Sequence, residues 1–71
     1  MTNEEKKLFA EFENNVITRA EDDCKYWSDE LRLYPFPSMA QTYAVMLARE
    51  SSVKEIFRQL REVLDIQDFS I

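Results

Sequence analysis

The stretch YWSDELRLYPFPSMAQ, residues 26–41, decides the fold because it places two prolines between two long runs without a helix breaker. Pro35 and Pro37 lack a backbone N–H, and each disfavours helical backbone in the residue before it. Upstream, residues 3–33 contain neither glycine nor proline. The sequence therefore predicts a long first helix that ends near residue 33, followed by a corner at residues 34–37.

The first helix is predicted from its apolar pattern. Apolar side chains recur every three or four residues and form one stripe about 120° wide, as in an amphipathic helix with one buried side. The stripe consists of Phe9, Phe12, Val16, Ala20, Cys24, Trp27, Leu31 and Tyr34. Thr2 and Glu5 have the spacing of a capping box at its start. A helix over about residues 3–33 follows.

The chain after the corner allows two interpretations. In the first, one helix runs to about residue 66, because apolar residues keep a heptad-like spacing along it. That helix would place Glu50 on the apolar seam. In either case Ser38, three residues before Gln41, has the spacing of a capping box at the start of the helix after the corner. In the second interpretation the helix breaks near Ser51, because Ser52 stands three residues before Glu55 and supplies another capping box.

The direction of the apolar sets favours the break. Residues 40–47 and residues 53–64 carry apolar sets that point about 120° apart on a straight helix. We therefore expect helices over about residues 39–50 and 53–66, or one bent helix. The last segment, residues 65–71 with Phe69 and Ile71, is expected to fray or to fold back over the open end.

The fold class is all-α with a single domain over residues 1–71. The chain has no glycine, which primed hairpin turns and phosphate-binding loops require. Two shorter helices, or one bent helix, are expected to pack on the first as a helical hairpin or three-helix bundle. This architecture resembles that of small antiparallel helical hairpins that dimerise into four-helix bundles, a likeness of shape alone.

The small size of the chain predicts association. A 71-residue chain with one cysteine and no histidine can form neither an internal disulfide nor a usual structural zinc site. A single hairpin also buries only one stripe per helix. We therefore expect a homodimer, or a subunit covered by another protein. The candidate dimer or core stripe is Phe9, Phe12, Val16, Trp27, Leu31, Phe57, Leu60 and Leu64.

Catalytic chemistry is not expected. Histidine, the usual general base, is missing, and Cys24 lies on the apolar stripe, where a buried thiol is inert. No metal or cofactor is expected. The net charge of −5 counts against nucleic acid. The first residues lack the apolar core of a signal peptide, and the longest apolar run is six residues, so we expect a cytoplasmic protein without a membrane span.

Two features suggest where a partner binds. Proline-locked Tyr34 and Phe36 form either a plain corner or a pair of rings held out for a partner. Acidic residues on the outer side of the first helix form either an ordinary solvated surface or one that imitates nucleic-acid phosphates. Tyr26 lies with Leu33 off the main stripe. The candidate partner-binding residues are Tyr26, Tyr34, Phe36, Glu21, Asp22 and Asp29.

The function expected from these features is that of a small acidic protein-binding module. It would regulate or inhibit a larger protein by occupying one of its surfaces, and an anti-defence protein of a phage or mobile element is one such inhibitor. A structural subunit of a larger helical assembly is the alternative. A nucleic-acid mimic is less favoured, as is a dimeric nucleic-acid binder, which needs dimerisation to gather Arg19, Lys25, Arg58 and Arg61 on one side.

Overall fold

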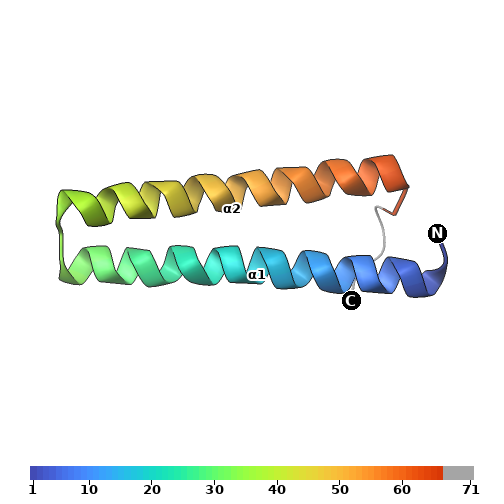
Figure 1. Cartoon of the computed structure of the whole chain (residues 1–71), viewed down its shortest axis with the longest axis horizontal. Coiled ribbons are helices and arrows are strands. Elements are labelled where there is room, and N and C mark those ends of the chain that lie inside the picture. The colour runs from blue at the N-terminus through green and yellow to red at the C-terminus, as the bar shows by residue number, and fades with distance from the viewer. Residues whose placement is uncertain (67–71) are drawn as a thin grey trace.

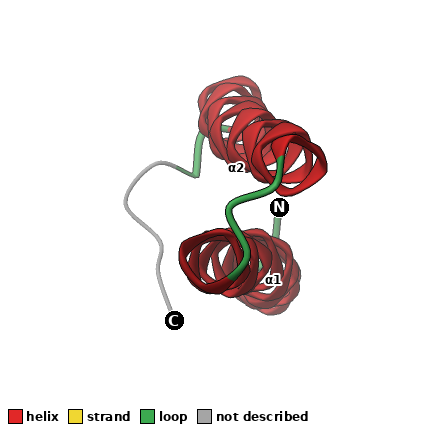
Figure 2. Cartoon of the chain, turned by 90° about the vertical axis from the view of Figure 1, so that its left-hand side faces the viewer, coloured by secondary structure: helices red, strands yellow, loops and turns green. Residues whose placement is uncertain are grey.

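The computed structural model describes residues 1–66, and in this part of the chain it contains two α-helices and no strand. Helix α1 spans Asn3–Leu33 and helix α2 spans Pro37–Leu64. They run antiparallel and side by side as an elongated hairpin (Figure 1), with extents of 48 × 18 × 13 Å. Viewed along its length, the molecule is one pair of helices joined by the corner (Figure 2).

Helix α1 begins at the capping box expected from the sequence. The backbone N–H of Glu5 donates to Thr2 Oγ1 at 3.1 Å, and the N–H of Thr2 donates to Glu5 Oε1 at 3.0 Å. Both groups would otherwise lack an intrahelical partner. The prediction of a first helix over residues 3–33 is confirmed.

The proline corner is also confirmed, but α2 starts earlier than expected. The N–H of Phe36 donates to the Tyr34 carbonyl at 2.7 Å, a γ-turn around Pro35. Pro37 is the first residue of α2, a position where a backbone N–H has no intrahelical acceptor, so proline costs no hydrogen bond there. The expected cap at Ser38 is wrong, since Phe36 is the N-cap residue and makes no side-chain cap bond.

Helix α2 is continuous through Ser51 and Ser52, so the predicted break is wrong and no three-helix bundle forms in residues 1–66. A charged Glu50 on the apolar seam was an argument against one continuous helix, but its carboxylate has an ion-pair partner there. Its Oε1 accepts from Lys54 Nζ at 2.9 Å. The apolar set of residues 40–47 does not bend the helix, because Leu47 simply remains exposed.

The core of the hairpin is small. Its buried apolar side chains are Ala10, Ala20, Cys24, Phe57 and Ile66. Phe57 anchors the end opposite the corner, where its ring meets the rings of Phe9 and Phe12 edge-on at centroid distances of 5.8 and 5.6 Å. The two helices are thus held by one narrow seam.

Helix α2 ends at Leu64, and its C-cap residue Asp65 has a φ of 56°, in the left-handed region. The end is two residues earlier than expected from the sequence. Ile66 turns back into the hairpin, and its carbonyl accepts from Arg61 Nη1 at 2.8 Å. Most of the segment expected to fray or fold back, including Phe69 and Ile71, lies outside the described residues. Neither α1 nor α2 is long and apolar enough for a membrane span.

Candidate functional site: two exposed surfaces of the hairpin

Helix α2 covers only one edge of the apolar stripe of α1. The buried residues of α1 are Ala10, Ala20 and Cys24, whereas Phe12 is 60% exposed. At about 100° per residue, the buried seam is rotated roughly 60° from the centre of the apolar stripe. The other edge of the stripe therefore faces solvent.

Ion pairs bridge the two helices on one side of the hairpin, where Glu13, Glu21 and Arg61 also line a small pocket of about 220 Å³. Arg61 donates to both carboxylate oxygens of Glu13 at 2.7 Å, and the two side chains are only 15% and 17% exposed. The bidentate hydrogen bond to Glu13 raises the pKa of Arg61. Further along, Lys54 Nζ lies 3.2 Å from Glu21 and 2.9 Å from Glu50, and these hydrogen bonds raise the pKa of Lys54.

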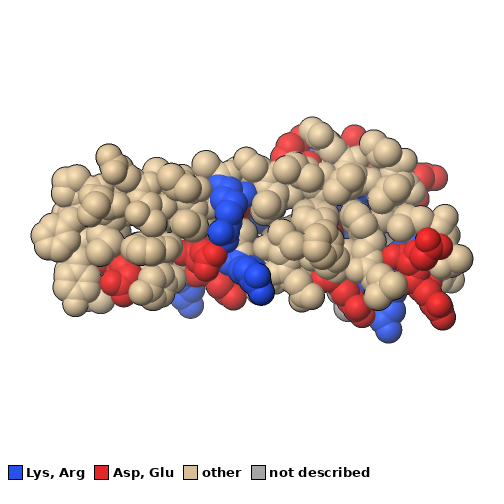
Figure 3. All heavy atoms as spheres, in the orientation of Figure 1, with Lys and Arg blue, Asp and Glu red and all other residues tan. Residues whose placement is uncertain are grey.

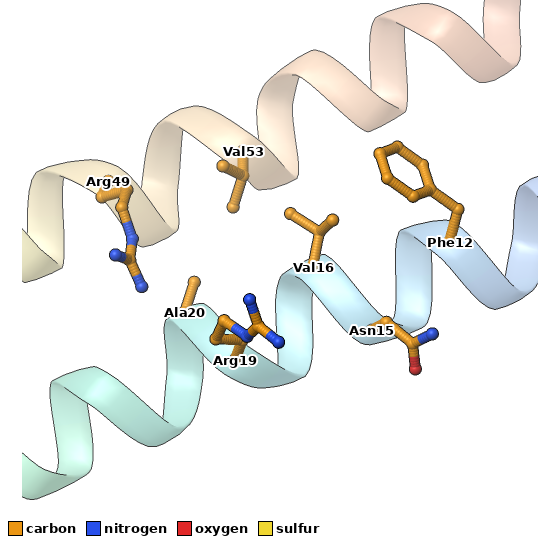
Figure 4. A pocket seen from close by; sticks show the side chains of 7 residues that line it. All are labelled: Phe12, Asn15, Val16, Arg19, Ala20, Arg49 and Val53. Atoms are coloured by element: carbon orange, nitrogen blue, oxygen red, sulfur yellow. The ribbon is translucent and has the colours of Figure 1, made fainter.

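An apolar groove of about 370 Å³ opens on the opposite side, between the two helices. Figure 4 shows the Phe12 ring of α1 at one end of the groove and Arg49 of α2 at the other, with the guanidinium group of Arg19 of α1 between them. Val16 and Val53 lie between them. Arg49 pairs with Asp23, whereas Arg19 makes no ion pair with any residue in the described part.

Exposed apolar residues of α2 extend this groove toward the end opposite the corner. Ile56, Leu60 and Val63 follow Val53 at helical spacing, and Val63 is 82% exposed. Figure 3 shows this side: blue side chains cross the middle from α2 to α1, and uncharged surface lies on both sides of them. We call Phe12, Val16, Val53, Ile56, Leu60 and Val63 the groove face.

The predicted dimer or core stripe is therefore divided. Only Phe57 is buried in the chain's own core. Four of its members are half-buried against the other helix of the hairpin, namely Phe9, Val16, Trp27 and Leu31. Phe12, Leu60 and Leu64 are exposed, because the seam passes to one side of them.

The corner end carries a second exposed surface. Asp22, Tyr26, Asp29 and Leu33 follow one another at intervals of three or four residues, so they form one ridge along the outer side of α1. The ridge leads to Tyr34 and Phe36, which are 51% and 58% exposed.

We call Asp22, Tyr26, Asp29, Leu33, Tyr34 and Phe36 the corner surface. Five of the six candidate partner-binding residues are exposed and belong to this surface by their helical spacing and their place at the corner. Glu21 is the exception, since it points toward α2 and pairs with Lys54. The Tyr26 ring rests edge-on against Trp27 at a centroid distance of 5.3 Å, which holds it in place.

Cys24 is buried in the seam, as expected. Burial, and then a hydrogen bond and the negative charge from Glu50, raise the pKa of its thiol to about 11. A neutral thiol is a poor nucleophile. Within residues 1–66 there is no group of three or more potential metal-ligating side chains.

Sequence reasoning missed two kinds of seam residue. Ala10 is buried but carries a weak apolar signal. Arg61 was named among the basic residues that a dimeric nucleic-acid binder would have to gather on one side, and its long-range partner Glu13 explains its burial. Comparisons with family models, curated proteins and solved structures found no match, so the two surfaces are interpreted from their own residues.

Proposed function

We propose that this chain is a small helical protein-binding module that acts on a larger protein, as a regulator or inhibitor, through its corner surface. The observation that carries the proposal is the exposure of Tyr34 and Phe36 on a rigid corner. Pro35 and Pro37 fix the backbone on which the two rings stand, so little conformational entropy is lost when a partner covers them.

The ridge on α1 indicates the chemistry of the partner. Tyr26 and Leu33 alternate with Asp22 and Asp29, so the surface offers apolar side chains flanked by carboxylates. Asp29 has only a loose ion pair, 3.9 Å from Arg32. The net charge of the chain is −5. The complementary partner has an apolar pocket for the rings and basic residues around it.

Site-specific photo-crosslinking in the cells in which the chain naturally occurs tests the proposal. A photoreactive amino acid replaces Phe36 in one variant and Leu47, an exposed apolar residue of α2 away from the corner, in the control. We expect position 36 to crosslink one larger protein that position 47 does not. Excess wild-type chain should suppress that product, and replacing Tyr34 with Ala should weaken it.

The contribution of the two aspartates to binding is tested with the protein that position 36 crosslinks. Asp22→Asn with Asp29→Asn should reduce its affinity and flatten the salt dependence of binding, because two carboxylates no longer attract the basic rim. If positions 36 and 47 crosslink the same set of proteins, or position 36 crosslinks only its own chain, the proposed function is wrong.

A further inference from the structure

We propose that the groove face binds a second copy of this chain, in an antiparallel register that pairs Arg19 of one copy with Glu5 of the other. The inference concerns a different surface from the corner surface and does not depend on the proposed function.

The whole elongated chain exposes more surface than a compact monomer of its mass, by an amount close to one side of a stable interface. The chain exposes 5403 Å², whereas a compact monomer of 8.5 kDa exposes about 4,700 Å². The excess, roughly 700 Å², is close to the area of about 800 Å² that each partner buries in an interface of standard size. The groove face is the side of the hairpin where exposed apolar residues of both helices meet.

The residues of α1 on this side are self-complementary about Phe12. Leu8 and Val16 lie four residues before and after it, and Glu5 and Arg19 lie seven residues before and after it. Seven residues are close to two helical turns, so Glu5, Phe12 and Arg19 lie nearly in line. A twofold axis through Phe12 and perpendicular to α1 would place Glu5 opposite Arg19 of the second copy.

The charges at the two ends of this line are suited to such a pair. Arg19 makes no ion pair with the described residues of its own chain. Glu5 is exposed, and its side chain is held by the capping bond from the Thr2 N–H. In an interface of two equal copies each contact occurs twice, so two Arg19–Glu5 pairs would form at opposite ends.

Helix α2 fits the same axis. Leu60 lies level with Phe12, because Phe57 contacts Phe12 and Arg61 contacts Glu13. Ile56 and Leu64 flank Leu60 by four residues on either side, and both are exposed. The second copy would thus bring Leu60 against Leu60 and Ile56 against Leu64, and the four helices would bury one apolar centre.

The first test is the oligomeric state of the full chain by sedimentation equilibrium over a hundredfold range of concentration. We expect a reversible dimer. Ile56→Gln should shift the chain toward monomer, whereas the control Leu47→Gln, an exposed apolar residue of α2 on another side, should not. A wild-type monomer at every concentration overturns the proposal, and so does a dimer that Ile56→Gln leaves unchanged.

The register is tested by reversing charges. Arg19→Glu should raise the dimer dissociation constant about tenfold or more, because two attractive pairs become repulsive. Glu5→Arg should also weaken the dimer. Mixing the two variants restores both opposite-charge pairs and should yield the mixed dimer at an affinity near that of wild type. Lys25→Glu makes the same charge change on the opposite side of α1 and is the control.

Folding of each variant is checked by circular dichroism, because Glu5→Arg removes half of the capping box. Glu5→Gln keeps a side chain that can complete the box and removes only the charge. It should weaken the dimer less than Glu5→Arg does. If the charge variants leave the dimer as tight as Lys25→Glu does, or if the mixture shows no preference for the mixed dimer, the proposed register is wrong.

Discussion

Cys24 shows how one buried residue links stability to pH. The raised pKa of about 11 means that the folded chain keeps the thiol proton in a range where the unfolded chain, with its ordinary value of 9.0, loses it. The folded state then binds more protons, so stability falls as pH rises from about 9 to 11.

The prediction is checked by urea unfolding of wild type and Cys24→Ala at several pH values. The variant loses stability at all pH values because it leaves a cavity, but it should lack this part of the alkaline decline. The raised pKa of Lys54 also makes stability depend on pH in the alkaline range, in wild type and in Cys24→Ala alike. The effect of Cys24 is therefore the difference between the two stability curves. Parallel curves for the two proteins would show that the Cys24 thiol has no part in the decline.

Glu13 is the second residue with a testable contribution to stability. Glu13→Gln should lower the free energy of unfolding by about 1–3 kcal/mol, because the largely buried Arg61 guanidinium loses its charged acceptor. Glu62→Gln is the matched control, since Glu62 pairs with Arg58 on the exposed surface. The control should change stability by less than about 0.5 kcal/mol. Equal losses in the two variants would contradict this account.

At the scale of the element, the continuity of α2 can be tested at Ser51 and Ser52. Both serines lie inside the helix and are exposed. Replacing both with Ala should raise the free energy of unfolding by about 0.5–1 kcal/mol, because Ala has the higher helix propensity. If Ser52 capped a separate helix, the change would instead lower it by about 1 kcal/mol.

Thr2→Ala is the control for the sign of this effect. Thr2 does cap a helix, through its bond from the Glu5 N–H. Its replacement should therefore lower the free energy of unfolding by about 1 kcal/mol. Thermal unfolding followed by circular dichroism compares the wild type, the double serine variant and Thr2→Ala under one set of conditions. A loss of stability in the serine variant would contradict a continuous α2.

The two helices were not equally predictable from the sequence. The bounds of α1 and the corner follow from local signals, namely the capping box at Thr2 and the two prolines. Glu50 is tolerated on the seam of a continuous α2 because Lys54, four residues further along the same helix, pairs with it and because Cys24 of α1 hydrogen-bonds it in the folded hairpin. The pairing with Lys54 follows from i, i+4 spacing, whereas spacing along one helix cannot reveal Cys24 as a partner.

The candidate surfaces were predictable to different extents for a similar reason. The prolines allowed either a plain corner or a pair of rings held out for a partner, and the structure shows that Tyr34 and Phe36 are exposed, as the second alternative requires. Binding of a partner there stays a proposal. Phe12 looked like a core residue, because the apolar stripe of α1 is wider than the edge that α2 covers. Which edge is covered depends on Ala10 and on the Glu13–Arg61 pair, neither of which is visible in the apolar pattern.

At the scale of the whole molecule, the proposed register predicts the length of the dimer. One chain is 48 Å long. The proposed axis passes near Phe12, so only about the first 20 residues of α1 and the facing part of α2 overlap. At about 1.5 Å per residue, two copies overlap over roughly 30 Å, and the dimer should be about 65 Å long. A dimer whose copies overlap along their full length would remain near the length of one chain.

Small-angle X-ray scattering over a dilution series measures this length. The maximum dimension should rise from that of the single hairpin toward about 65 Å as the dimer forms, while the cross-section thickens from two helices to four. Arg19→Glu should keep the single-hairpin curve at concentrations where wild type has changed. A dimer no longer than one chain would retain the groove face as an interface but exclude the pairing of Arg19 with Glu5, because that pairing requires the offset.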